Sequence, residues 1–225
     1  MSLFVTGTDT GVGKTFTAMS ILRLGRAAGM TCAGFKPICC GDRSDAELLL
    51  AASSPGLTLD ELNPIWLRTP AAPFSAALIE GVTVETAVVV KQLEALRGRF
   101  DLVVMEGAGG WLVPIRRDYF MSDLAREMGL PVLVVALNRL GCLNHTLLTL
   151  ESVRHSGLRC AGMVLNSIDA LADVAATTNR AVLSQLTEVP ILTELGAGIG
   201  EFPADWRSIV ELENVEGLSA KRTQV

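Results

Sequence analysis

A glycine-rich stretch near the start of the chain has the residue types of an anion-binding loop. Residues 7–15 read GTDTGVGKT and lie between an apolar run and a helical pattern. Gly11 and Gly13 allow backbone amides to turn toward an anion without a Cβ in the way. The helix that we expect to begin near Lys14 adds the positive end of its dipole. Phosphate binding is therefore the first chemistry that the sequence predicts.

This stretch departs by one residue from the usual phosphate-loop pattern, G-x-x-x-x-G-K-[ST]. Thr8 stands where the first glycine belongs, and Gly7 lies one place too early. Because the extra residue leaves the amides and the lysine in place, we interpret the stretch as a phosphate loop rather than a glycine-rich turn capped by Thr10. Lys14 can then reach terminal phosphates, and the Thr15 hydroxyl can ligate Mg²⁺.

Position 9 separates the chain from one class of nucleotide switch. Partition and targeting ATPases with the loop K-G-G-x-G-K-[ST] carry a second lysine five residues before the first, and here that residue is Asp9. An acid beside a bound triphosphate would repel it. We expect Asp9 either to face an amine or another cationic group, or to brace the turn.

Two charged residues, Lys36 and Glu106, stand at the ends of apolar runs that read as buried strands. In open α/β sheets, ligands bind beyond the carboxyl ends of the strands. Lys36 is expected to clamp a phosphoryl group in transfer, the alternative being a surface lysine whose stem covers apolar atoms. Glu106 is expected to bind a phosphate-bound Mg²⁺, the alternative being an ion-paired strand end. The glycines that follow, Gly109 among them, would let a substrate approach backbone amides.

Two further signals are less specific. Ser44 and Glu47 have the spacing of a capping box, so local sequence favours Asp45 as a first-turn residue that suits the helix dipole. In residues 138–149, NRLGCLNHTLLT, a loop again leads into a helix, with open amides near Cys142 to Asn144. Such a helix start suits a carboxylate as well as a phosphate.

Apolar strand-like runs alternate with helical patterns along the chain. Strands are predicted at residues 2–7, 31–37, 101–107, 131–137, 159–166 and 190–193. Helices are predicted at 14–28, from 44 onward, and at 84–97, 122–128, 143–156 and 170–187, and the Pro-rich stretch 54–83 is expected to be irregular. Continuous apolar strands between helices predict an α/β fold, with a mostly parallel central sheet and helices on both faces. We expect one domain over residues 1–211 and a loose tail over 212–225.

Composition and charge argue against several other classes of protein. The 225-residue chain has a net charge of −5 and no long basic stretch, so we expect no nucleic-acid partner. The longest apolar run, residues 130–137, is too short to span a bilayer, and the N-terminus lacks the basic segment of a signal peptide. The 5 cysteines, without C-x-x-C spacing, then read as reduced thiols of a cytoplasmic protein, and 2 histidines exclude a histidine-rich metal site.

Five segments taken together resemble one known family. FVTGTDTGVGKT, GFKP, SDAELL, VMEGAGGW and LGCLNHTLLT, in this order and spacing, closely resemble the dethiobiotin synthases of biotin biosynthesis, from about residue 3 to Asn166. The resemblance implies a three-layer P-loop NTPase fold and a homodimer whose active site lies at the subunit interface. It also implies small-molecule substrates, namely 7,8-diaminopelargonate, CO2 and ATP with Mg²⁺. The reaction would proceed through a carbamate and a carbamic–phosphoric anhydride.

The resemblance assigns roles residue by residue. Phosphate is held by Thr10 and by the amides of Gly11, Val12, Gly13 and Lys14. Lys14 and Lys36 stabilise the phosphoryl group and the carbamate, while Thr15, Asp45 and Glu106 hold Mg²⁺, which reverses the local interpretation of Asp45. Asn166 reads the adenine, Cys40 and Gly109 face the substrate, and Cys142, Leu143 and Asn144 receive the substrate carboxylate from the partner subunit.

Three positions depart from the family pattern. Cys40 stands where a serine hydroxyl is usual, and a thiol is a weaker hydrogen-bond donor. Arg139 replaces a lysine, and the segment 191–202 lacks the Ile-Pro expected near the adenine. The open alternatives are a nucleotide-switched partition or targeting protein and a paralogue that binds nucleotide without turnover. A related amide-forming enzyme with a glutaminase domain is not expected at this length.

Overall fold

The computed structural model describes residues 1–167, 174–196 and 202 of the chain. The predicted tail, residues 212–225, lies outside these residues, as does much of the segment 191–202 in which an Ile-Pro was expected. Among the described residues, no helix is both long enough and apolar enough to cross a membrane.

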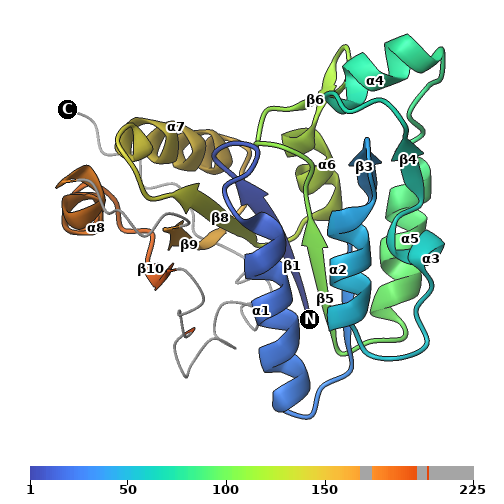
Figure 1. Cartoon of the computed structure of the whole chain (residues 1–225), viewed down its shortest axis with the longest axis horizontal. Coiled ribbons are helices and arrows are strands. Elements are labelled where there is room, and N and C mark those ends of the chain that lie inside the picture. The colour runs from blue at the N-terminus through green and yellow to red at the C-terminus, as the bar shows by residue number, and fades with distance from the viewer. Residues whose placement is uncertain (168–173, 197–201, 203–225) are drawn as a thin grey trace.

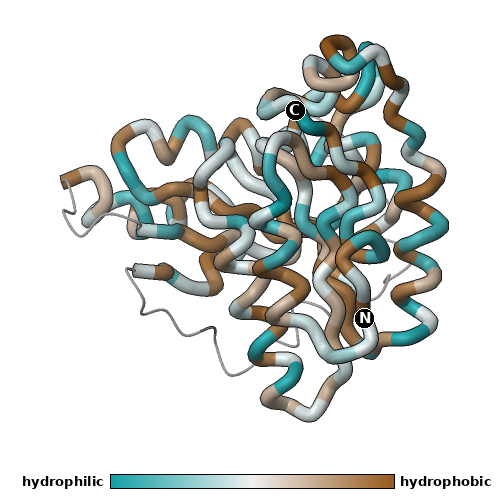
Figure 2. The backbone as a smooth tube through the Cα atoms, turned by 45° about the vertical axis from the view of Figure 1, so that its right-hand side comes forward, coloured by the Kyte–Doolittle hydropathy of each residue, from teal (hydrophilic) through white to brown (hydrophobic). Residues whose placement is uncertain are grey.

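The centre of the molecule is a six-stranded parallel sheet with the strand order β10-β9-β8-β1-β5-β2. Its strands are β1 (Ser2–Gly7), β2 (Cys32–Phe35), β5 (Leu102–Glu106), β8 (Val132–Leu137), β9 (Cys160–Asn166) and β10 (Ile191–Leu195). The strands β1, β2 and β5 are buried along their whole length, which explains their continuous apolar sequences. Figure 2 shows the hydrophobic segments running through the middle of the molecule.

Helices cover both faces of this sheet (Figure 1). On one face lie α1 (Lys14–Ala27) and α2 (Ser44–Ala52), packed with alternate residues of β1, β5 and β8 into one apolar cluster. The other face carries α5 (Ala87–Arg97), α6 (Met121–Met128), α7 (Cys142–His155) and α8 (Val174–Leu186), which contribute to the second cluster. The predicted α/β fold with helices on both faces is therefore confirmed.

The prediction of an irregular stretch at 54–83 is wrong in part. This stretch contains α3 (Leu59–Leu62), β4 (Ile65–Leu67) and α4 (Pro73–Glu80). A capping box between Thr58 and Glu61 starts α3, and Pro73 occupies the first turn of α4. β4 pairs in parallel with β3 (Ile38–Cys40), a short strand that directly follows Lys36 and Pro37.

A second small pair, β6 (Pro114–Arg116) and β7 (Tyr119–Phe120), was also not predicted. In Figure 1, α4, β6 and the pair β3–β4 lie together beyond the end of β5. Of these additions, β3 and the residues 70–73 that lead into α4 line a cavity at the carboxyl edge of the sheet.

Candidate active site

The loop between β1 and α1 has the backbone of a phosphate loop. Its first amide, from Thr8, donates to Val135 O at 2.9 Å and ties the loop to β8. Gly11 and Gly13 have φ values of 72° and 92°, in the left-handed region that favours glycine. α1 begins at Lys14 with Gly13 as its N-cap and no side-chain cap, so the alternative of a turn capped by Thr10 is wrong.

Gly13 has a second reason to be glycine. A Cβ at this position would lie 1.7 Å from Asn166 Nδ2, so a side chain would displace Asn166, and the φ of 92° would strain it as well. Asn166, at the end of β9, donates from Nδ2 to Val12 O at 2.9 Å. The structure therefore places Asn166 against the loop as a brace. Its contact with adenine stays a prediction.

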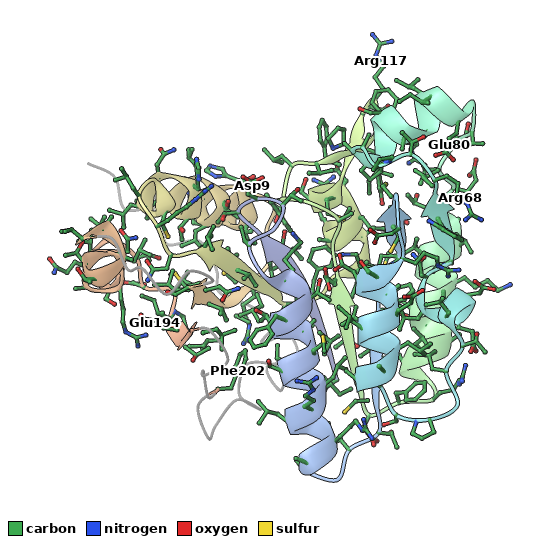
Figure 3. All side chains as sticks on the ribbon, in the orientation of Figure 1. Asp9, Arg68, Glu80, Arg117, Glu194 and Phe202 are labelled. Carbon is green, nitrogen blue, oxygen red and sulfur yellow. The ribbon has the colours of Figure 1, made fainter. Side chains whose placement is uncertain are left out.

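Lys14 is buried beside the loop and held by it. Its Nζ donates to Asp9 O at 3.0 Å. Burial, helped by the nearby Lys36, lowers the pKa of Lys14 to about 8, although the surrounding carboxylates act in the opposite direction. The Asp9 carboxylate accepts from Thr10 N at 2.7 Å, so Asp9 braces the turn, and Figure 3 shows it on the loop above α1.

Four predicted residues meet in one cluster at the carboxyl edge of the sheet. Lys36 Nζ lies 2.5 Å from Glu106 Oε1 and 3.0 Å from Asp45 Oδ2. Thr15 Oγ1 lies 2.8 Å from Asp45 Oδ1 and 3.0 Å from Glu106 Oε1. Burial alone would lower the pKa of Lys36, but the two carboxylates outweigh it and raise that pKa above its usual value.

Asp45 belongs to this cluster and lies, as predicted, in the first turn of α2. The residue before α2 is Arg43, which makes no side-chain cap, and the Ser44 hydroxyl donates to Asp42 at 2.6 Å. The capping box predicted from Ser44 and Glu47 is therefore absent. Asp45 points to Lys36 and Thr15 instead; partial burial raises its pKa, but Lys36 outweighs burial and the net shift is downward.

The oxygens of this cluster fit a hard divalent cation. Mg–O bonds of about 2.0–2.1 Å place neighbouring ligand oxygens of an octahedron about 2.9 Å apart. The distances from Thr15 Oγ1 to the two carboxylates, 2.8 and 3.0 Å, match this edge length. The single hydroxyl proton can serve only one of these contacts at a time.

Glu106 adds a second argument for a cation. Its side chain is fully buried, and its Oε2 has no hydrogen-bond partner among the described residues. A buried carboxylate oxygen without a donor is costly unless something else binds it. No group of three or more His, Cys, Asp or Glu side chains that could hold a metal ion occurs in the described part of the chain. Such a cation would therefore need water or phosphate oxygens as further ligands, as Mg²⁺ usually does.

Two cavities meet at Lys36. One, of about 500 Å³, lies over the phosphate loop and α1, and is lined among others by Gly11, Gly13, Lys14, Thr15 and Glu106. The other, of about 380 Å³, lies under β3 and the turn before α4, and is lined among others by Cys40, Asp42 and Ala108. The residues that line both cavities are Thr10, Lys36, Asp45 and Gly109.

The second cavity contains the predicted substrate-facing residues and others that the sequence analysis missed. Cys40 lines it, and burial, with Glu80 acting in the same direction, raises the pKa of its thiol to about 11. Among the missed residues are those at positions 70–73, which line this cavity together with Lys36. The Pro-rich sequence TPAAP after the apolar IWL was the only signal for this wall.

Cys142, Leu143 and Asn144 are not part of this cluster within one chain. They form the first turn of α7, after Gly141 with a φ of 90°, and line neither of the two cavities. Cys142 is buried, with Sγ 3.6 Å from Thr146 Oγ1, whereas Asn144 is exposed. Figure 1 shows this helix beginning at the far side of β8 from β5.

A buried pair of amides, also missed from the sequence, supports the turn before α7. Asn179 on α8 donates to Asn138 Oδ1 at 2.9 Å and to Arg139 O at 3.1 Å. The Asn138 backbone amide donates to Asn166 O at 2.8 Å. These bonds connect the helix start at 142 to the residue that braces the phosphate loop.

Comparisons with known proteins identify the relatives of this chain. The family AAA_26, described as an AAA domain, matches residues 1–197. The ATP-dependent dethiobiotin synthetase BioD of Akkermansia muciniphila is 46% identical over 194 residues, which cover 86% of this chain and 91% of that protein. The proteins of the same name from Aromatoleum aromaticum and Bacillus licheniformis are 42% and 38% identical, over 89% and 84% of this chain and 92% and 83% of theirs.

Solved structures with similar folds are more distant. The septum site-determining protein MinD of Pyrococcus horikoshii, complexed with Mg-ADP, has a TM-score of 0.55 at 15% identity, covering 88% of this chain and 82% of its own. The cell division protein FtsY of Thermotoga maritima has a TM-score of 0.54 at 16% identity, covering 93% of this chain and 67% of its own. At these identities the likeness shows the fold alone.

Proposed function

Because this chain belongs to the family of ATP-dependent dethiobiotin synthetases, and is thus an ATP-dependent ligase of biotin biosynthesis, we propose that its cluster at Lys36 closes the ureido ring of dethiobiotin. The substrates are 7,8-diaminopelargonate, CO2 and ATP. The observation that carries the proposal is the position of Lys36, which lines both the cavity over the phosphate loop and the cavity under β3. A group transferred from nucleotide to substrate must pass this point.

The reaction needs no nucleophile from the protein. One substrate amine adds its lone pair to the carbon of CO2 and loses a proton, giving a carbamate. A carbamate oxygen then attacks the γ-phosphorus, and the bond to the ADP oxygen breaks. The second amine attacks the carbonyl carbon of the resulting anhydride, the ring C–N bond forms, and phosphate leaves. The protein contributes positioning and charge stabilisation, which fits a cluster of lysines, carboxylates and glycine amides.

Each part of the site has a task in this scheme. The amides of Gly11 to Lys14, with Thr10, bind the phosphates, and the Lys14 ammonium stabilises their terminal charge. Lys36 stabilises the carbamate and the phosphoryl group from between the two cavities. In the second cavity, Cys40 and Gly109 face the carbamate, and the neutral Cys40 thiol offers only a weak hydrogen bond.

Thr15, Asp45 and Glu106 would hold Mg²⁺. Bound there, the cation supplies charge neutralisation for the phosphate oxygens of ATP. The support is the octahedral edge length from Thr15 to each of the two carboxylates, together with the unpartnered Oε2 of buried Glu106. Asp45 can fulfil this task because it is not engaged in a cap.

The substrate carboxylate is bound by a second copy of the chain. The first turn of α7, Cys142 to Asn144, has the amides for a carboxylate, yet within one chain it lines neither reaction cavity. A homodimer that brings this turn over the partner's second cavity would complete the site. Asn166, beside the phosphate loop, reads the adenine in the same scheme.

One reaction mixture tests the proposal. Purified protein is incubated with MgATP, bicarbonate and 7,8-diaminopelargonate, and the products are identified by mass spectrometry. We expect dethiobiotin with an equal amount of ADP, and no ADP above background when the diamine is omitted. Lys36→Ala should abolish turnover while ATP still binds. If the wild-type protein binds ATP but forms no dethiobiotin, the proposal is wrong and the chain is a nucleotide switch or an inactive paralogue.

A further inference from the structure

Lys36 and the proposed Mg²⁺ would bind the same two carboxylates, those of Glu106 and Asp45. Lys36 Nζ lies 2.5 Å from Glu106 Oε1 and 3.0 Å from Asp45 Oδ2. Glu106 Oε1 is also one of the two carboxylate oxygens at octahedral edge distance from Thr15 Oγ1. A divalent cation bound to Thr15 and Glu106 would therefore lie next to the Lys36 ammonium, and like charges at such distances repel strongly where water is excluded.

We propose that Lys36 is an exchangeable placeholder, which neutralises Glu106 and Asp45 while no divalent cation is bound and leaves them for the cavity under β3 when one binds. This rests on the proposed function only through the choice of Thr15, Asp45 and Glu106 as metal ligands. It adds an order of events. Lys36 becomes free to meet negative charge on the substrate only once the carboxylates have another cation.

The neutralising part of this role follows from burial. Glu106 is fully buried and Lys36 is almost fully buried, so each would be costly without the other. Lys14, the other lysine of the site, does not contact the carboxylates in this structure, and its Nζ is bonded to Asp9 O instead. In the metal-free protein, Lys36 therefore supplies the direct counter-charge to Glu106 among the described contacts.

The exchange is possible because the Lys36 side chain lies beside a cavity into which it can move. Its side chain lines the cavity of about 380 Å³ as well as the cavity over the phosphate loop. Besides the carboxylates, its Nζ contacts the backbone Gly107 O at 3.4 Å, a long bond that is easily given up. Cys40 and Gly109 line the same cavity, where the carbamate is expected. A released ammonium would thus move toward the carbamate.

The first test measures binding of Mn²⁺ alone, without nucleotide, by electron paramagnetic resonance. Lys36→Met removes the competing ammonium, and we expect its Mn²⁺ affinity to rise by about tenfold or more over wild type. Lys14→Met is the matched control, because it removes a nearby positive charge that does not touch the carboxylates, and it should raise the affinity by less than about threefold. Equal affinities in the two variants, or no Mn²⁺ binding in any of the three proteins, would overturn the proposal.

A second test needs no variant at position 36. The sequence has four lysines, Lys14, Lys36, Lys91 and Lys221. Spectra of protein with ¹³C at the lysine side chains are therefore simple, and substituting the other three singly by arginine assigns the Lys36 signal. Addition of Mg²⁺ without nucleotide should shift the Lys36 signal with a midpoint that matches Mg²⁺ binding, while an equal ionic strength of NaCl should not.

An unchanged Lys36 signal at saturating Mg²⁺ contradicts the placeholder role. Neither test involves turnover, so its outcome is independent of the proposed reaction. A protein that makes dethiobiotin but keeps Lys36 on its carboxylates refutes only this inference. A protein that exchanges Lys36 for Mg²⁺ but makes no dethiobiotin refutes only the proposed function.

Discussion

Replacing Lys36 by methionine removes the buried cation between Glu106 and Asp45 while keeping most of the side-chain volume. Glu106 is fully buried, and its contact to Lys36 is 2.5 Å. Breaking a buried ion pair by removing one partner costs about 3–5 kcal/mol, because the remaining charge is left uncompensated. We expect the free energy of unfolding of Lys36→Met in metal-free buffer to fall by about this amount.

The double variant separates this charge effect from a loss of packing. Lys36→Met combined with Glu106→Gln removes both charges and should recover most of the loss, to within about 2 kcal/mol of wild type. Glu106→Gln alone should cost less than Lys36→Met, because Lys36 keeps its 3.0 Å contact to the half-exposed Asp45. The same double-mutant cycle gives the coupling energy between the two side chains.

Urea denaturation in the presence of a chelator measures all four proteins, with the slope m checked for constancy. Lys91→Met on the exposed side of α5 is the control for the substitution itself and should stay within about 0.5 kcal/mol of wild type. A loss below about 1 kcal/mol in Lys36→Met, or a double variant less stable than either single one, would refute the argument that the pair neutralises itself in the metal-free state.

Three further predictions concern the loop and its supports. Gly13→Ala should abolish nucleotide binding measured by calorimetry, because its Cβ would lie 1.7 Å from a neighbouring amide, whereas Gly29→Ala, with a φ of 82° and no atom within 4 Å, should leave binding unchanged. The pKa of about 8 makes Lys14 neutral at high pH, so nucleotide affinity should fall by about fivefold between pH 8 and 9, with proton uptake on binding. In Lys14→Arg, a pH dependence as steep as that of wild type would show that another group is responsible. Asn179→Ala removes two donated hydrogen bonds and should lower the free energy of unfolding by about 1–3 kcal/mol. Thr178→Ala, on the exposed face of the same helix, is the control and should not lower it. Equal effects of the two substitutions would contradict the assigned bonds.

The central sheet could be predicted because its strands are buried on both faces. LFVTG, LVVME and VLVVAL are continuous apolar runs between helical patterns, and this alternation is typical of a parallel sheet that helices cover on both sides. The short strand Ile38–Cys40 could not be predicted in the same way. It has three residues, and it exists only because Ile65–Leu67, more than twenty residues later, pairs with it.

The stretch 54–83 shows what local signals can and cannot give. Thr58 and Glu61 have the spacing of a capping box, and this box is present in the structure. The start of α3 could therefore have been predicted from the sequence. Ser44 and Glu47 have the same spacing, yet no box forms there. The start of α2 differs because Ser44 is already the first helical residue, one position after the N-cap Arg43, and its hydroxyl donates to Asp42.

The buried amides lie at the other limit of prediction. Asn179 stands in the helix sequence VAATTNRAVLSQL, where nothing distinguishes it from an exposed polar side chain. Its burial results from the packing of α8 beside the loop 138–141, and this packing depends on tertiary structure rather than on local sequence. The roles of Cys142, Leu143 and Asn144 likewise depend on a second chain and stay predictions.

Both lysines of the site are bound to oxygens of the protein when no substrate is present. Lys14 donates to Asp9 O, and Lys36 is bonded to Glu106 and Asp45. A reaction that builds negative charge on a carbamate and a phosphoryl group needs cations that are already stripped of water, because reorganising solvent at that moment would cost energy. Protein oxygens keep the two ammonium groups dehydrated and in place. In the order proposed above, a divalent cation first replaces Lys36 at its carboxylates, and substrate oxygens then become the partners of both lysines. The same contacts that quench the charge of the lysines therefore prepare them for the reaction.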